Sequence, residues 1–447
     1  MTAPEQTSSP ATGARAPLRP LVQYASGSFG MGVWVTVPGL LLLYFLTDIV
    51  GVAAALAGLT LLVPKVIDVV AHPLIGSRSD RQARTIGHRR RMMTGGVLLG
   101  LAMVAMFSVP SGLEGPPAAA WVAGWFIVGN LLFAMFQVPY LTTPSDLRID
   151  YHERTRVFMF RMLFLTVGLL GAGVAAPALV ASERRGAYTT MALVLAVVMV
   201  VSALVAIRGV RGLTDACGFR PPPASAGHST LADVKVAWAD RDFRMLVLSY
   251  LFTGTTTHLF LAALPYFTRY VFDSAGLTAV FMGSFLAPAV FAGPVWLRLS
   301  RRLGKQRGLL VSQAIFVAGS LGLLLAAQIG VVASVVIVVA MGFAFAGLQL
   351  FAFSMVPDAV AAAEATGSAQ AGSYTGVWTA TEALGTAIGP YLYAAALAIG
   401  GFVSSTAGVD ADQPDSALRM LLLGFTVLPA ALMVVAIGFQ RRYSLDR

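Results

Sequence analysis

Three ionisable side chains lie in the strongly apolar stretch from Leu61 to Gly76. They are Lys65, Asp68 and His72, at positions i, i+3 and i+7. On an α-helix, with 100° per residue, these positions fall within about 60° of one another. A charged residue at bilayer depth costs about 2.5–3.5 kcal/mol on insertion scales, so it faces a cavity or a partner. We therefore expect the stripe to face a water-filled route. In the alternative, Lys65 and Asp68 form an ion pair that only holds helices together, with His72 hydrogen-bonded in packing.

The composition of the chain is that of a membrane protein. Of its 447 residues, 57% are hydrophobic and only 12% are charged, whereas about a quarter of a soluble domain is charged. We therefore expect a polytopic membrane protein with the lipid bilayer around it. The net charge of +10 comes from basic residues in short loops between apolar blocks. These residues are topology signals, and no nucleic-acid partner is expected.

The sequence does not indicate catalytic chemistry. The single cysteine, Cys217, excludes an intramolecular disulfide framework and a cysteine-based zinc site. The sequence contains no nucleotide-binding loop, no zinc-ligand spacing and no nucleophile elbow. We therefore expect neither an enzyme nor an ATP-driven pump, and no bound metal or organic cofactor.

Twelve apolar segments are long enough to cross a bilayer, which takes roughly 20 residues. The expected spans are residues 22–48, 52–76, 93–111, 117–141, 157–181, 188–207, 243–270, 278–299, 308–328, 331–356, 372–400 and 417–440. The one long break contains the polar stretch GFRPPPASAGHS, which is typical of a flexible linker. The predicted organisation is a disordered cytoplasmic tail (1–20), an N-terminal half (21–207), a cytoplasmic linker (208–242), a C-terminal half (243–440) and a cytoplasmic tail (441–447).

The distribution of basic residues predicts the orientation of these spans. Arginine and lysine gather in loop 77–92, after the fourth span, in the linker, between the eighth and ninth spans and at the C-terminus. All these segments fall on one side of the twelve-span arrangement. The predicted location is the plasma membrane, with many passes and both termini in the cytoplasm. The loop after the tenth span is an exception, because it carries Asp358 and Glu364 and no basic residue.

Six plus six helices about a long loop are the plan of the major facilitator superfamily, an all-α membrane fold of two six-helix halves. Several motifs sharpen this expectation: YASGSFG (24–30), YFLTDIVG (44–51), IDVVAHPLIGSRSDR (67–81), GHRRR (87–91), VPYLTTPSDLRIDYHERTR (138–156), LPYFTRYV (264–271), MVPDAVAAAEATG (355–367) and GSYTGVWTATEALG (372–385). As a set they resemble the glycoside–pentoside–hexuronide:cation symporters, the branch that includes the melibiose permease, along nearly the whole chain. The resemblance implies symport of a sugar-like solute with a cation by alternating access.

The match to this family is partial at the positions that bind cation and sugar. The family's acidic residue is kept at Asp68, Lys65 matches a basic position, and Arg161 matches a family arginine. The family has acidic residues at three positions that differ here, Gly32, His72 and Gln137. A sodium site wants several hard oxygen ligands, whereas histidine titrates near neutral pH. We therefore expect H⁺ coupling through Asp68 and His72 beside Lys65, with Na⁺ as the alternative coupling ion.

Side chains on several spans are candidates for contact with the solute. They are Gln137, Tyr140, Arg161, Thr257, His258, Trp378 and Glu382. Trp378 and Glu382 are four residues apart and share a helix face, and a buried glutamate in a span is a functional candidate by default. The alternatives are polar packing for Thr257 and His258, and for Glu382 a salt bridge to a loop arginine at the cytoplasmic end.

Charged residues in the loops are expected to latch a cytoplasmic gate. They are Asp80, Arg81, Asp150, Glu153, Arg154 and Asp358. The stretch GSRSDRQARTIGHRRR resembles the superfamily signature between the second and third spans, in which Asp80 and Arg81 pair with neighbouring helix ends. Asp358 is expected to cap a helix or to latch the gate in the second half.

The predicted function is secondary active transport, as a symporter of a sugar-like or other small polar solute. Loss of acidic sugar ligands also suits a lysolipid or another amphiphilic solute, which more distant relatives of the family carry. An alternative of another class is a non-transporting membrane sensor or scaffold on the same fold. We expect a monomer, the default of the superfamily.

Overall fold

The structure is a computed structural model that describes residues 15–221, 238–365, 371–407 and 411–445. The helices of the first half of the chain are α1 (Leu18–Tyr44), the π-helical turn η1 (Phe45–Ile49), α2 (Ala54–Ile86), α3 (Arg90–Met93), α4 (Gly95–Phe107), α5 (Gly115–Thr142), η2 (Thr143–Ser145), α6 (Tyr151–Leu179) and α7 (Arg185–Cys217). Those of the second half are α9 (Arg241–Phe272), α10 (Leu277–Leu303), α11 (Lys305–Gly322), η3 (Leu323–Leu325), α12 (Ala326–Ala365), α13 (Ala371–Gly400) and α14 (Asp415–Gln440). In this part of the chain, two isolated β-bridges join Val50 to Thr406 and Leu147 to Phe219.

Each of the twelve expected spans overlaps one of these helices. Ten stretches of the described residues are long and apolar enough to cross a membrane. One of the ten, Lys305–Ala362, includes both α11 and α12, and α2 is not among the ten. The backbone leaves the helical conformation at Gly330, where φ is 78°. Gly330 therefore makes the turn between the ninth and tenth expected spans.

The helices α2 and α7 each continue ten residues beyond the ends predicted for their spans. With 33 residues, α2 is about 50 Å long, whereas the hydrocarbon core is about 30 Å thick, so its end projects into water. It ends where Gly87 adopts a left-handed conformation (φ 71°) and bonds through its N–H to the carbonyl of Ala83. Similarly, α7 runs on to Cys217, inside the segment predicted as linker.

The predicted tails and linker are ordered in part. Ala16 is buried, and its N–H lies 3.2 Å from Glu153, so the tail predicted at 1–20 is fixed at its end; residues 1–14 are outside the described residues. Within the predicted linker, residues 222–237 are likewise outside, whereas Phe219 pairs with the loop before α6. In the C-terminal tail, Tyr443 is buried and the Ser444 hydroxyl donates to Asp242; residues 446 and 447 are outside the description.

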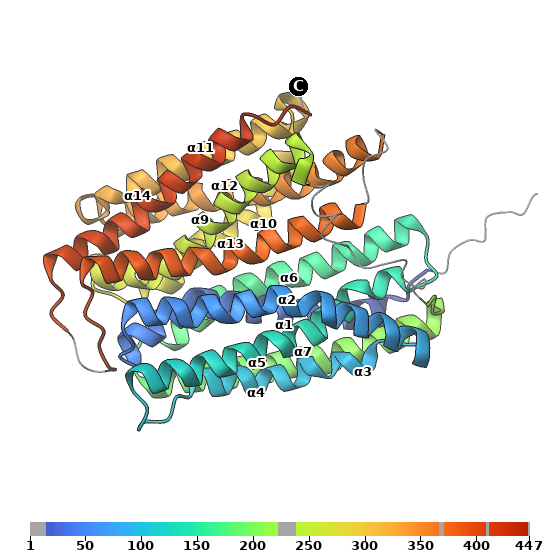
Figure 1. Ribbon diagram of the computed structural model, residues 1–447, viewed down its shortest axis with the longest axis horizontal. Helices are drawn as coiled ribbons and strands as arrows, with labels where there is room; N and C mark the ends of the chain where they lie inside the picture. Colours follow the sequence, from blue (N-terminus) through green and yellow to red (C-terminus); the bar gives the residue numbers. More distant parts are fainter. Residues whose placement is uncertain (1–14, 222–237, 366–370, 408–410, 446–447) are drawn as a thin grey trace, which may run out of the picture.

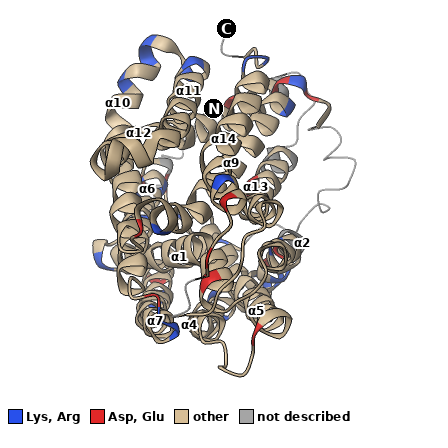
Figure 2. Cartoon of the chain, turned by 90° about the vertical axis from the view of Figure 1, so that its left-hand side faces the viewer, with Lys and Arg blue, Asp and Glu red and all other residues tan. Residues whose placement is uncertain are grey.

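The helices run side by side in two groups (Figure 1), with α1–α7 in the lower part of the view and α9–α14 in the upper part. The groups meet through α2 with α13, α6 with α10, and α1 with α9. Figure 2 looks onto the left-hand end of Figure 1. It shows α6 beside α10 and α12 at one edge and α2 beside α13 at the other, with α1 and α9 between them. A stripe on α2, α1 or α9 can therefore lie at the boundary of the two halves.

Candidate functional site

The stripe of Lys65, Asp68 and His72 lies on the side of α2 opposite its exposed apolar face. The exposed apolar side chains of this helix include Val63, Val66, Ile67 and Leu74. At 100° per residue, the centre of that face is roughly 170° from the centre of the stripe. The stripe therefore points away from the exposed face and toward neighbouring helices.

Asp68 is the centre of the stripe. Its carboxylate lies 3.9 Å from the Lys65 ammonium and 3.2 Å from Nδ1 of His72. The Asp68 side chain is 9% exposed, against 25% for Lys65 and 28% for His72. One carboxylate thus lies between two basic groups in a partly exposed site. Both contacts are attractions between opposite charges, so a proton on Asp68 would weaken both of them.

The helix α5 supplies two amide side chains to the same site. His72 Nε2 is 3.2 Å from Oε1 of Gln137, and Lys65 Nζ donates to Oδ1 of Asn130 at 3.4 Å. Nδ1 of His72 also lies 2.9 Å from the carbonyl oxygen of Asp68. Both ring nitrogens therefore face oxygen acceptors, an arrangement that an imidazolium with two N–H donors satisfies.

Asn130 is a member of this site that the sequence interpretation missed. Asn130 is almost fully buried, and its Nδ2 has no hydrogen-bond partner in the described structure. The position is seven residues before Gln137, so the two amides share one face of α5. That spacing, inside an apolar helix, was the available signal.

In the second half of the chain, α13 packs against α2 on the side of the stripe: a Cβ at Gly58, seven residues before Lys65, would lie 2.7 Å from the Cβ of Ala394. The candidates Thr257 and His258 are on α9. Nδ1 of His258 lies 2.9 Å from the carbonyl of Gly254, and the Thr257 hydroxyl donates to the same carbonyl at 3.0 Å. Thr257 is buried. Thr257 and His258 thus both bond to their own helix, which is the alternative of polar packing.

The pair on α13 lies in an aromatic environment. Trp378 is buried, stacks on Tyr250 with ring centroids 4.1 Å apart, and meets the edge of Phe353 at 5.5 Å. Its Nε1 has no hydrogen-bond partner in the described structure. Glu382 is half-buried and forms no ion pair with any described residue, so the predicted salt bridge to a loop arginine is not seen there.

Tyr140 and Arg161 lie apart from the stripe. Tyr140 is fully buried in the packing of α5 against α1, where its hydroxyl lies 2.8 Å from the Ser28 hydroxyl and its ring stacks on Tyr24. The Arg161 guanidinium lies 4.9 Å from the ring centroid of Phe158, and its Nε has no hydrogen-bond partner in the described structure.

The acidic position of the family that is Gly32 here has no room for a side chain. A Cβ at Gly32 would lie 2.8 Å from the backbone nitrogen of Leu169 and 2.9 Å from the carbonyl carbon of Gly168. The backbones of α1 and α6 touch at this point. A carboxylate at residue 32 is therefore incompatible with this packing of α1 and α6.

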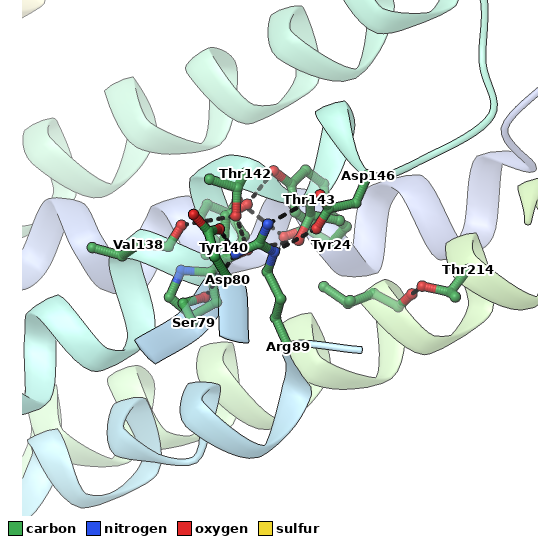
Figure 3. Close-up of polar contacts among 12 residues, drawn as sticks. Tyr24, Ser79, Asp80, Arg89, Val138, Tyr140, Thr142, Thr143, Asp146 and Thr214 are labelled. Carbon is green, nitrogen blue, oxygen red and sulfur yellow. Dashed lines mark hydrogen bonds and ion pairs between the residues drawn. The ribbon is translucent and has the colours of Figure 1, made fainter. Parts of the chain in front are cut away.

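The loop charges form a cluster around Arg89, which the sequence interpretation did not single out (Figure 3). Its guanidinium is 2.5 Å from Asp146, 2.5 Å from Asp80 and 3.0 Å from the Ser79 hydroxyl. Burial works to lower the pKa of Arg89, but the bonds to Asp146 and Asp80 outweigh it and raise the pKa above its usual value. For Asp146 the effect of burial is larger than that of its partner: burial raises the pKa of the carboxyl, although the contact with Arg89 works to lower it. The cluster joins α2, the start of α3 and the end of α5.

The other predicted latch residues have local roles. Arg81 is exposed, while Asp150 caps α6 by accepting from the N–H of Glu153 at 2.7 Å. Glu153 pairs with Arg156 at 2.6 Å, and the N–H of Arg154 bonds to the carbonyl of Asp150. Asp358 lies inside α12 and pairs with Lys305 at the start of α11; it therefore caps no helix. These contacts stay within one half of the chain.

Comparison with known proteins identifies the family. The family described as MFS/sugar transport protein matches residues 23–447. An uncharacterized symporter of Synechocystis sp. is 24% identical over 95% of this chain and 93% of its own length. The sodium-dependent lysophosphatidylcholine symporter 1 of Mus musculus is 22% identical over 72% of this chain and 66% of its own length.

Solved structures share the fold. The crystal structure of a nucleoside transporter covers 94% of this chain and 99% of its own, with a TM-score of 0.68 and 13% sequence identity. The prediction of an all-α major facilitator fold is confirmed. The predictions of a multi-pass membrane protein and of a carrier of small molecules, as opposed to an enzyme, are confirmed as well. With a family match over nearly its whole length, the chain belongs to the MFS/sugar transport protein family of secondary transporters.

Proposed function

We propose that the protein is a symporter of a small polar, sugar-like solute, driven by H⁺ through Asp68 and His72. It works as a monomer in the plasma membrane, by alternating access, with both termini in the cytoplasm. The observation that carries the proposal is the position of Asp68 between Lys65 and His72, on the side of α2 on which Gly58 meets α13 of the other half. The symporter relative and the family description support the transport of a sugar-like solute.

The geometry suggests how a proton would be coupled to movement. With Asp68 ionised, the carboxylate holds the Lys65 ammonium and the His72 ring on α2. A proton that binds Asp68 from one side cancels this attraction and frees Lys65 toward Asn130. Loss of the proton on the other side restores the pair. The site thus has two charge states, which would differ in how firmly Lys65 and His72 are held on α2.

The solute would lie at the boundary between the stripe and α13. Glu382, which has no ionic partner in the described structure, and the Nε1 of Trp378, which has no acceptor there, offer an acceptor and a donor for hydroxyl groups. Gln137, Tyr140, Arg161, Thr257 and His258 remain proposed solute contacts. Of these, Gln137 contacts the stripe, through His72.

Uptake into proteoliposomes tests the coupling ion. One pH unit supplies about 1.4 kcal/mol, which supports at most roughly tenfold accumulation per proton at a 1:1 ratio. A solute found by a binding screen should accumulate with an imposed pH gradient and not with a Na⁺ gradient at fixed pH. Asp68→Asn should abolish this accumulation while Asp215→Asn, in an exposed pair with Arg211 along α7, retains it. Accumulation that follows Na⁺ at fixed pH, or unchanged accumulation in Asp68→Asn, would refute the proposal.

A lysolipid or another amphiphile is the second candidate solute. The mouse lysophosphatidylcholine symporter favours it, as does the absence of side-chain space at Gly32, where the sugar-transporting family carries an acid. Competition separates the two solutes: free sugars should block uptake if the first proposal holds, and lysolipids if the second does. A sensor or scaffold would show no solute flux into sealed vesicles at all.

A further inference from the structure

The left-hand end of the bundle in Figure 1 joins the two halves through backbone pairing. There α1 widens into the π-helical turn η1, in which the N–H of Val50 bonds to the carbonyl of Phe45. This turn leaves the carbonyls of Thr47 and Ile49 free for other donors. The N–H groups of Ser405 and Ala407 take them at 2.9 and 3.1 Å.

Residues 404–407, which we call the strap, therefore pair with the end of α1 like a short strand. Thr406 forms an antiparallel bridge with Val50, and the Ser404 hydroxyl donates to the carbonyl of Val52 at 2.8 Å. The strap follows α13 and belongs to the second half of the chain, whereas η1 belongs to the first. A movement that separates the halves at this end must break this pairing.

A buried carboxylate, Asp48, lies in the same turn. The Tyr270 hydroxyl donates to its Oδ1 at 2.6 Å, and the Thr47 hydroxyl donates to its Oδ2 at 2.5 Å. Because the Thr47 hydroxyl uses its one hydrogen in the bond to Asp48, it accepts a hydrogen bond from the Tyr266 hydroxyl, whose oxygen is 2.6 Å away. Both tyrosines are on α9. Tyr270 thus bonds to Asp48 directly, and Tyr266 bonds to it through Thr47.

A second carboxylate at this end, Glu183, joins the same helices. It lies in the turn between α6 and α7, accepts from the Tyr44 hydroxyl of α1, and is 3.1 Å from Arg269 of α9. Arg269 also pairs with Asp273, one turn further along its own helix. Glu183 is more exposed than Asp48, so water can replace its contacts more easily. Asp48 has no such replacement while the strap covers it.

We propose that Asp48 is a gating residue of transport, which holds this end shut through Tyr270 and Tyr266 and whose release lets the halves part there. The inference rests on the proposed function in one respect, since it takes this end as the extracellular one. The bonds of Asp48 across the boundary exist only while the end is closed. Weakening them should shift the population toward the form that is open at this end, without any change at the Asp68 site.

A thiol reporter tests the proposal without any solute. Met282 on α10 is almost fully buried and contacts the position of Gly173 on α6, so a cysteine there is reached from outside only when the halves part. Met282→Cys is made in a Cys217→Ala chain, which removes the protein's only other thiol. The measurement is the rate of labelling by a membrane-impermeant maleimide added outside right-side-out vesicles. Its outcome is independent of which solute the protein carries.

Asp48→Asn should raise the labelling rate roughly tenfold, the change expected when one hydrogen bond to a charged group is lost from a single state. Tyr270→Phe, which keeps the ring and removes the donor, should act in the same direction. Asp412→Asn is the matched control, because Asp412 is exposed between the strap and α14 and forms no ion pair with any described residue; its labelling rate should equal that of the parent. Equal rates in Asp48→Asn and in Tyr270→Phe, each eluting as a folded monodisperse protein, would overturn the gate.

The transport assay separates a gating role from a merely structural one. Asp48→Asn should change the maximal rate of uptake while the concentration for half-maximal binding of the solute, measured at equilibrium, changes much less. A variant with altered labelling and normal coupling to H⁺ supports the gate whatever becomes of the proposed coupling residues. If labelling rises only when the maleimide is inside the vesicles, this end is not extracellular and the proposal fails in that form.

Discussion

Removal of the Arg89 side chain should destabilise the protein by about 3 kcal/mol. Arg89 is 5% exposed and holds two carboxylates, of which Asp146 is 9% exposed and Asp80 36%. Removing one partner of a buried ion pair costs about 3–5 kcal/mol, because the other charge stays buried without a partner. Asp80 regains water, so we expect the lower end of this range for Arg89→Met. With an unfolding entropy near 2.1 cal/mol/K per residue, this cost corresponds to a fall of roughly 3 °C in Tm for a chain of this length.

The effect of Arg89→Met should depend on pH with a definite sign. The pKa of Asp146 is already raised by burial, and loss of Arg89 raises it further. A carboxyl whose folded pKa lies above its unfolded value binds more protons in the folded state, so stability rises as pH falls. The deficit of Arg89→Met relative to the parent should therefore be largest near pH 8 and shrink toward pH 5.

Thermal unfolding in detergent at several pH values measures both effects. Arg91→Met is the matched control, because Arg91 is exposed and no ion pair of the described structure includes it. Its Tm should stay within about 1 °C of the parent at each pH, as is usual for exposed charges. An equal Tm and an equal pH dependence for the two variants would refute the view that Arg89 neutralises a buried carboxylate.

Two further variants test packing and exposed charge. Gly32→Ala should destabilise the protein by about 1–3 kcal/mol, because the added Cβ meets the backbone of α6 at 2.8 Å. The control Gly39→Ala, with no atom within 4 Å of its Cβ, should be neutral or stabilise the protein by up to about 1 kcal/mol. Equal Tm values for the two variants would contradict the close approach of α1 and α6. Lys305→Met should cost less than about 1 kcal/mol, since the Lys305 and Asp358 side chains are 37% and 47% exposed; a fall in Tm as large as that of Arg89→Met would show that exposure does not set the strength of these pairs.

The sequence predicted the helices well and their ends poorly. Apolar runs of span length indicate a helix because a bilayer leaves no other way to satisfy the backbone. The same rule ends where the bilayer ends, and α2 continues into water on charged residues until Gly87. The predicted end at residue 76 marks where the sequence ceases to be apolar. The helix itself ends only at the glycine that caps it.

The candidate site, like the helices, could be predicted from the sequence only in part. The stripe on α2 was predictable because Lys65, Asp68 and His72 are on one helix, where spacing alone fixes the common face. Partners on other helices, such as Asn130, and partners across loops, such as Asp146 for Arg89, depend on how helices dock. The side chain of Asp146 is 57 positions from that of Arg89 along the chain. No local pattern in either segment specifies their pairing.

The contact between α1 and α6 at Gly32 has a consequence for how the specificity of this chain can evolve. Because Leu169 and Gly168 present backbone, and not a side chain that could be shortened, to residue 32, no single substitution at residue 32 can place a carboxylate there. A second change that moves the two helices apart would have to come first, with a loss of packing before any gain in binding. Engineering of a new solute specificity should therefore begin at the candidate positions on α5, α9 and α13.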